Sequence, residues 1–128
     1  MGNGTSIGRV RGLGSAHHGA HHWLLQRTTA IGNVVLMAWL LASFVMLGDF
    51  GYDSVVKWLS QPIAAVPMIL LVISLFWHAR LGLQVVIEDY VHDTGTKFAA
   101  LSALNLAILG GGAFAIFSVA ALSFGGQA

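Results

Sequence analysis

Three long stretches of this sequence carry no charged residue, and they limit what the chain can fold into more than any other feature. They cover residues 28–48, 58–79 and 98–128. A helix that crosses the hydrocarbon core of a membrane needs about 20 consecutive apolar residues. Strands are disfavoured, because the stretches show no strict alternation and are much longer than a typical strand. The pattern therefore predicts three transmembrane helices.

The composition of the whole chain supports this prediction. Charged residues make up 9% of the 128 residues, whereas a typical soluble domain has about 25%. The high apolar content argues against a disordered protein, and the net charge of +1 argues against a nucleic-acid-binding protein, which would need a basic surface. Without cysteine, the chain cannot hold a disulfide framework, a thiolate-bound iron–sulfur cluster or a c-type haem.

We expect an all-α membrane protein with a single domain over residues 1–128 and helices over about 28–47, 62–88 and 97–124. The second helix should begin near Pro62 or Pro67, because proline suits the first turn of a helix. Residues 1–22 form a polar segment that lacks the apolar core of a cleavable signal peptide. Between the first two helices, Asp53 is expected to cap a short helical turn on the membrane surface.

The basic residues predict the orientation of the helices. Arg9, Arg11 and Arg27 precede the first helix, and Lys97 lies in the second loop, whereas the first loop has only Lys57. Basic residues are enriched on the cytoplasmic side of membrane proteins. The N-terminus should therefore be cytoplasmic and the C-terminus periplasmic.

One histidine falls deep inside the second predicted helix. His78 lies eleven residues before Asp89, which should mark the cytoplasmic boundary, and this spacing places it about 16 Å deep, near the middle of the bilayer. Imidazole is a common axial ligand of haem. Gly82, one turn further on, would let a flat macrocycle approach, and Phe76 and Trp77 would supply apolar walls. The alternative is a histidine hydrogen-bonded to a neighbouring helix. A six-coordinate haem would need its second axial ligand from a partner subunit.

Two arginines each allow two interpretations. Arg80 lies two residues after His78 and so points about 200° away from it around the helix. It either extends toward the lipid headgroups or pairs with a carboxylate or an anionic group of a partner. Arg27, at the cytoplasmic entry of the first helix, either anchors the helix at the membrane surface or pairs with haem propionates.

The end of the second helix carries a possible quinone contact. Tyr90 either hydrogen-bonds a quinone carbonyl or is an ordinary interfacial aromatic residue. Asp89 lies within about 20° of the helix stripe that holds His78. In the third helix, small residues predict a close helix-packing face: Ala107, Gly110, Gly111, Gly112 and Ala113.

Two segments together resemble a known family. Residues 78–90 read HARLGLQVVIEDY, with Asp and Tyr eleven and twelve positions after His, and residues 21–30 read HHWLLQRTTA. Both are similar to segments of the hydrophobic membrane anchor subunit of succinate dehydrogenase (respiratory complex II), of the alphaproteobacterial or mitochondrial type. The chain departs from the family at His22, where an Asp can stand, and at Arg80, where other members can have an aromatic residue.

The resemblance implies roles for four residues. His78 would be the axial ligand that this subunit gives to haem b, with the second ligand supplied by the cytochrome b subunit. Tyr90 would contact ubiquinone, with Asp89 as the neighbouring acid near the quinone pocket. Arg27 would lie near the haem propionates. The resemblance assigns no role to Arg80 or to the N-terminal histidines.

The implied function is that of the membrane anchor of succinate:ubiquinone oxidoreductase, a multi-pass protein of the bacterial inner membrane in the respiratory chain and the tricarboxylic acid cycle. The chain would carry no bond-making catalytic group. Flavin and iron–sulfur clusters would belong to the flavoprotein and iron–sulfur subunits. Two alternatives stay open: the anchor of a fumarate reductase, and a small transporter or channel subunit in which His78 and Arg80 line a proton or anion path.

Overall fold

The computed structural model describes residues 19–125, and in this range it contains four helices and no strand. They are α2 (Gly19–Leu47), α3 (Tyr52–Leu59), α4 (Pro62–Tyr90) and α5 (Thr94–Gly125). By length and composition α2, α4 and α5 can each cross a membrane. The prediction of an all-α protein with three spans is confirmed. The first 18 residues of the predicted polar segment lie outside the described range.

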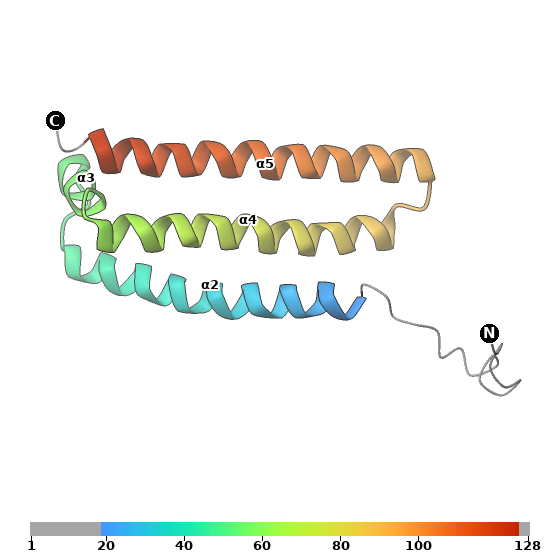
Figure 1. Ribbon diagram of the computed structural model, residues 1–128, viewed down its shortest axis with the longest axis horizontal. Coiled ribbons are helices and arrows are strands. Elements are labelled where there is room, and N and C mark those ends of the chain that lie inside the picture. Colours follow the sequence, from blue (N-terminus) through green and yellow to red (C-terminus); the bar gives the residue numbers. More distant parts are fainter. Residues whose placement is uncertain (1–18, 126–128) are drawn as a thin grey trace, which may run out of the picture.

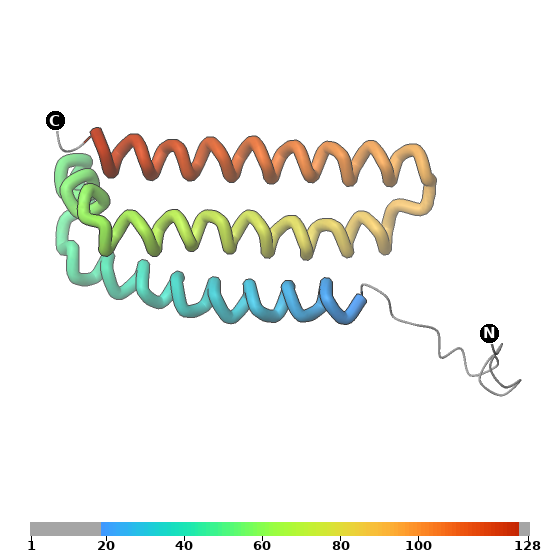
Figure 2. Tube along the Cα trace, viewed as in Figure 1, coloured from blue at the N-terminus to red at the C-terminus, as the bar shows by residue number. Residues whose placement is uncertain are grey.

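The long helices run side by side, with α4 between α2 and α5 and in contact with both (Figure 1). The tube in Figure 2 shows that the described part of the chain enters at one end of this arrangement and leaves at the other. Helix α3 lies at the end where α2 passes into α4. The start of α2 and the end of α4 therefore share the opposite end, which is where the sequence places Asp89 and Tyr90.

The helices extend further than the uncharged stretches predict. Helix α2 starts at Gly19 instead of about residue 28, because polar residues continue a helix beyond the lipid when no proline or tight turn stops it. Helix α4 starts at Pro62, as expected, and continues through Pro67. A proline inside a helix removes one backbone hydrogen bond, and membrane helices tolerate this loss when neighbouring groups satisfy the freed carbonyl.

The short helix α3 differs from the prediction at its start. Gly51 occupies the N-cap position and makes no side-chain cap, and Asp53 lies inside the first turn, so Asp53 is not the cap. Asp49 shapes this turn instead, because its carboxylate accepts hydrogen bonds from the Ser54 hydroxyl and the Gly51 amide. Both bonds favour the charged form and hold the pKa of Asp49 below its ordinary value. Ionised Asp49 therefore fixes the connection between α2 and α3.

Aromatic side chains fasten α3 to the end of α2. The Trp58 ring stacks on the Trp39 ring at 5.9 Å between centroids and lies 5.8 Å from the Phe44 ring. Leu59 is buried. The apolar side of α3 thus packs partly against the helices, in addition to the membrane surface that the sequence predicts for it.

A glycine pair lets α4 and α5 approach closely. A Cβ atom on Gly111 would stand 2.9 Å from the Phe76 ring, and one on Gly112 would stand 3.5 Å from it, whereas one on Gly110 would meet no atom within 4 Å. Ala107 and Ala113 are exposed. The predicted packing face is therefore narrower than expected, because consecutive helical residues point about 100° apart and cannot all face one neighbour.

We predict that Gly111→Ala destabilises the protein relative to Gly110→Ala. Both changes replace a helical glycine by alanine, so the gain in helix propensity is the same and cancels in the comparison. Only the Gly111 variant forces Phe76 to move, and such overpacking costs about 1–3 kcal/mol. Thermal unfolding of the full chain in detergent, followed by circular dichroism, measures the difference. Equal stability of the two variants would contradict the packing described here.

Candidate functional site

A row of polar groups lies between α2 and α4, near the middle of the membrane-spanning part. His78 stands about two residues past the midpoint of α4, which is about 3 Å along the helix axis. Its Nδ1 atom lies 3.0 Å from the Thr29 hydroxyl oxygen of α2. One turn earlier on α4, the Ser74 hydroxyl donates to the Thr29 backbone oxygen at 3.5 Å. His78 therefore faces α2 and is only half-buried.

The hydrogen bond to Thr29 is the contact expected of a histidine that serves only to join two helices. It uses one of the two ring nitrogens, however. Within residues 19–125 the structure records no hydrogen bond to His78 Nε2. One ring nitrogen held by a hydroxyl and the other open is also the arrangement in which imidazole binds a metal. The donor chemistry of His78 fits an axial ligand of haem.

The surroundings of His78 differ from the sequence prediction. A Cβ atom on Gly82 would lie 3.9 Å from the Gln26 side-chain amide of α2, so part of the face expected for a macrocycle is covered by a helix. Phe76 packs on the glycines of α5, and Trp77 lines the hollow between α4 and α5. Phe76 forms no wall beside His78, because it points about 200° away around α4 and packs on α5.

Asn33 is a further polar residue of the α2–α4 contact, and it was not predicted from the sequence. It lies one turn after Thr29 on α2 and is 9% exposed. Its Oδ1 atom is buried and has no hydrogen-bond partner within residues 19–125. An amide in the middle of an uncharged stretch was the available signal, since polar residues inside a membrane usually face protein or water.

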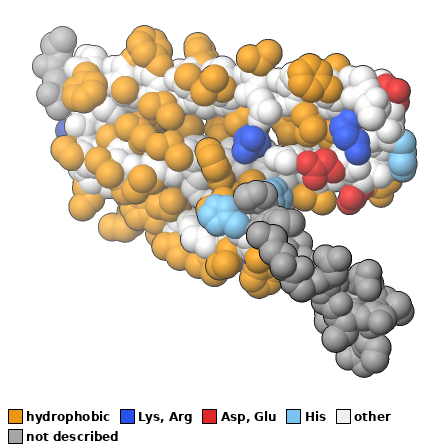
Figure 3. Space-filling view, turned by 45° about the vertical axis from the view of Figure 1, so that its right-hand side comes forward, with side chains coloured by type: hydrophobic (Ala, Val, Ile, Leu, Met, Phe, Trp, Pro, Cys, Tyr) orange, Lys and Arg blue, Asp and Glu red, His pale blue; other side chains and the backbone are white. Residues whose placement is uncertain are grey.

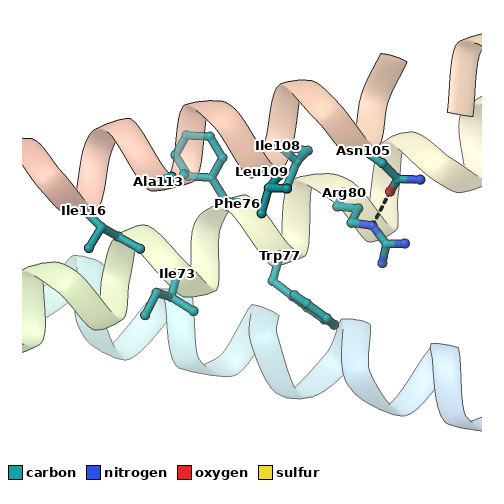
Figure 4. Close-up of a pocket in the computed structure, with 10 residues that line it drawn as sticks. Ile73, Phe76, Trp77, Arg80, Asn105, Ile108, Leu109, Ala113 and Ile116 are labelled. Atoms are coloured by element: carbon teal, nitrogen blue, oxygen red, sulfur yellow. Dashed lines mark hydrogen bonds between the residues drawn. The ribbon is translucent and has the colours of Figure 1, made fainter. Parts of the chain in front are cut away.

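Arg80 faces the opposite side of α4, as its spacing from His78 predicts. Its Nε atom donates to Asn105 Oδ1 of α5 at 2.6 Å, and its guanidinium carbon lies 5.6 Å from the centre of the Trp77 ring. Figure 4 shows these side chains at one end of an apolar hollow between α4 and α5. The hollow measures about 340 Å³, and Ile73 and Ile116 lie toward its other end. Asn105 is a partner that the sequence did not predict.

Arg27 is exposed on α2, with its guanidinium carbon 5.3 Å from the centre of the Trp23 ring. It precedes Thr29 by two residues and therefore points about 200° away from the side of α2 that meets His78. The chain alone does not bring Arg27 and His78 together on one face.

The predicted quinone residues lie at the end of α4. Tyr90 is 79% exposed, and Asp89 is exposed as well. Just before them, Gln84 donates to the Glu88 carboxylate at 2.8 Å, and the Lys97 ammonium of α5 donates to the Glu88 backbone oxygen at 3.0 Å. The end of α4 is therefore held by its own side chains and by α5, while Tyr90 and Asp89 stay open to a partner.

Another hollow lies at the same end, between the start of α2 and the end of α4. It measures about 430 Å³, and its polar lining residues are His22, Gln26 and Glu88. In Figure 3, charged and histidine side chains gather toward one end of the molecule, whereas hydrophobic side chains cover most of the remaining visible face. The polar end and the histidine in the span are thus the two chemically distinctive regions of the described chain.

The amino-acid sequence of the chain matches a known family over most of its length. The family model described as succinate dehydrogenase/fumarate reductase transmembrane subunit matches residues 1–120. The chain belongs to this family. The succinate dehydrogenase hydrophobic membrane anchor subunit of Rickettsia bellii is 39% identical over 103 residues, covering 80% of this chain and 82% of that protein. The corresponding subunit of Rickettsia conorii is 36% identical over 88 residues, 68% of this chain and 70% of that protein.

A third relative has the same type of name. The succinate dehydrogenase membrane anchor subunit of Reclinomonas americana is 31% identical over 86 residues, covering 65% of this chain and 72% of that protein. The resemblance read from residues 21–30 and 78–90 is thus confirmed. A multi-pass membrane anchor of the succinate dehydrogenase type accounts for the three spans and for the low charge.

Proposed function

We propose that this chain is the anchor subunit of a succinate:ubiquinone oxidoreductase in a bacterial inner membrane, and that it binds haem b through His78 and ubiquinone through Tyr90 and Asp89. The observation that carries the proposal is the placement of His78: near the middle of a span, in an anchor-family chain, with Nδ1 in contact with Thr29 and no hydrogen bond to Nε2 within residues 19–125. Electrons would come from succinate through separate flavoprotein and iron–sulfur subunits, since this chain has no cysteine for a cluster.

The residues of the chain supply binding and positioning in this mechanism. Haem, when bound, supplies one-electron redox chemistry. His78 would hold the haem iron together with a histidine of the cytochrome b subunit. Ubiquinone reduction takes up two electrons and two protons. The Tyr90 phenol would donate a hydrogen bond to a quinone carbonyl, and exposed Asp89 would pass protons from water at the same membrane edge.

The basic residues support the assignment of this edge to the cytoplasm. Lys97 lies at the end of the molecule that carries Tyr90, Arg27 lies in the half of α2 nearer this end, and Lys57 lies on α3 at the other end. The positive-inside rule then puts the N-terminus in the cytoplasm and the C-terminus in the periplasm. Succinate oxidation and quinone reduction would both take place on the cytoplasmic side.

Co-purification tests the proposed function. A tagged full chain, extracted from membranes in mild detergent, is expected to bring down three further subunits and the absorption spectrum of a six-coordinate b-type haem. The purified complex should reduce ubiquinone with succinate. If the chain were purified alone and without haem from membranes that have succinate dehydrogenase activity, the proposal would be wrong.

The two alternative functions are not equally supported. The anchor of a fumarate reductase runs the same chemistry in the opposite direction, and the matching family model covers both enzymes. A proton or anion path through His78 and Arg80 is disfavoured, because His78 contacts α2 and Arg80 contacts α5 on opposite sides of α4. The two side chains therefore do not line one path.

A further inference from the structure

The hydroxyl that touches His78 has its own hydrogen already engaged. Thr29 Oγ1 lies 2.9 Å from the backbone oxygen of Leu25 and 3.1 Å from that of Gln26. A hydroxyl has one hydrogen and two lone pairs, and a carbonyl oxygen can only accept. The Thr29 hydrogen therefore points back into its own helix, and a lone pair of Oγ1 points at the imidazole.

This arrangement fixes the proton of His78. With the Thr29 hydrogen directed to its own helix, Oγ1 offers a lone pair 3.0 Å from Nδ1, and an Nδ1 that carries hydrogen and donates it to Thr29 is the matching partner. In neutral imidazole the second nitrogen, Nε2, then has the free lone pair. The same bond also limits rotation of the ring about its Cβ–Cγ bond, since α2 and α4 hold the two partners. A metal can thus bind only at Nε2, from a direction that the helix pair sets.

We infer that Thr29 is a positioning residue for haem: it selects the Nδ1–H tautomer of His78, orients the ring and strengthens its donation to iron. This inference rests on the proposed function, namely that His78 is the axial ligand. A hydrogen bond accepted from Nδ1–H gives the ring partial imidazolate character, which makes Nε2 a stronger donor. Stronger donation favours ferric over ferrous iron and therefore lowers the reduction potential of the haem.

The chain offers a matched control for this role in Thr28. Its hydroxyl donates to the Leu24 backbone oxygen at 2.9 Å, the same bond within the helix that Thr29 makes, but Thr28 is exposed and the structure records no hydrogen bond from it to His78. Replacing either threonine by valine keeps the shape and the β-branch and removes the hydroxyl. Only Thr29→Val also removes the contact with His78.

The experiment compares the purified complex with wild-type, Thr29→Val and Thr28→Val anchors, reading the midpoint potential of the haem by redox titration and haem release to an excess of apomyoglobin. Thr29→Val is expected to raise the potential and to speed haem release about tenfold, the usual size of the effect when a ligand loses its supporting hydrogen bond. Thr28→Val should have the same midpoint potential and the same rate of haem release as wild type. Thr29→Ser, which keeps the hydroxyl, should restore the potential toward the wild-type value.

Each outcome decides a different point. If Thr29→Val and Thr28→Val had the same potential and the same release rate, Thr29 would have no positioning role, even with His78 as a confirmed ligand. A wild-type complex without haem would instead overturn the proposed function, and the role of Thr29 with it. Should the valine variant fail to assemble, Thr29→Ala removes the same hydroxyl with less bulk, and the prediction for it is the same.

Discussion

Replacing His78 by alanine should remove the ligated haem b from the purified complex. Alanine leaves no donor atom on this side of the iron, and His78 is the only histidine of α4. The expected result is loss of the sharp six-coordinate spectrum, through either loss of haem or a change to a five-coordinate form. The reduced-minus-oxidised absorption spectrum, with haem content per flavin, measures it.

His92→Ala serves as the control for this prediction. His92 is exposed in the connection between α4 and α5, beyond the end of the span that holds His78. Its replacement should leave the haem spectrum unchanged. Oxidation of succinate with a soluble electron acceptor should survive both changes, because the flavin belongs to another subunit. A normal spectrum with normal haem content in the His78 variant would disprove the ligand assignment.

The sequence predicts the fold of this chain well because the membrane imposes one strong requirement. A backbone in lipid must satisfy its own hydrogen bonds, so three long uncharged stretches leave little choice but three helices. The ends of the helices are less predictable. Helix α2 continues outward to Gly19, where lipid no longer selects against polar side chains. At the start of α3, Asp53 lies within the helix because Asp49 already forms the hydrogen bonds of the preceding turn.

The sequence predicts the central residue of the site, His78, but not the residues that contact the site from neighbouring helices. His78 is conspicuous because an ionisable group in lipid is costly. Thr29 is not conspicuous, since the hydroxyls of Thr28 and Thr29 each form a hydrogen bond within α2. Only the rotation of α2 about its axis, relative to α4, decides which of the two threonines contacts His78. The same holds for Asn105, which becomes the partner of Arg80 through the close packing of α4 on α5.

Conversion of Tyr90 to phenylalanine should slow ubiquinone reduction while leaving succinate oxidation intact. The change removes only the phenolic hydroxyl, and Tyr90 is 79% exposed at the end of α4, so little of the fold depends on it. A hydrogen bond to the quinone carbonyl contributes about 1 kcal/mol to binding, and a proton-donating role in the transition state contributes more. Succinate–ubiquinone activity should therefore fall about tenfold or more.

Tyr52→Phe provides the matched control, because Tyr52 is the other tyrosine of the chain and is 74% exposed on α3 at the opposite end. It should affect neither assay. The ratio of ubiquinone-linked to soluble-acceptor activity separates a quinone contact from a general loss of complex, since poor assembly lowers both rates together. A ratio in the Tyr90 variant equal to that of wild type would show that the phenol makes no catalytically relevant contact with quinone, and that Tyr90 is an interfacial aromatic residue.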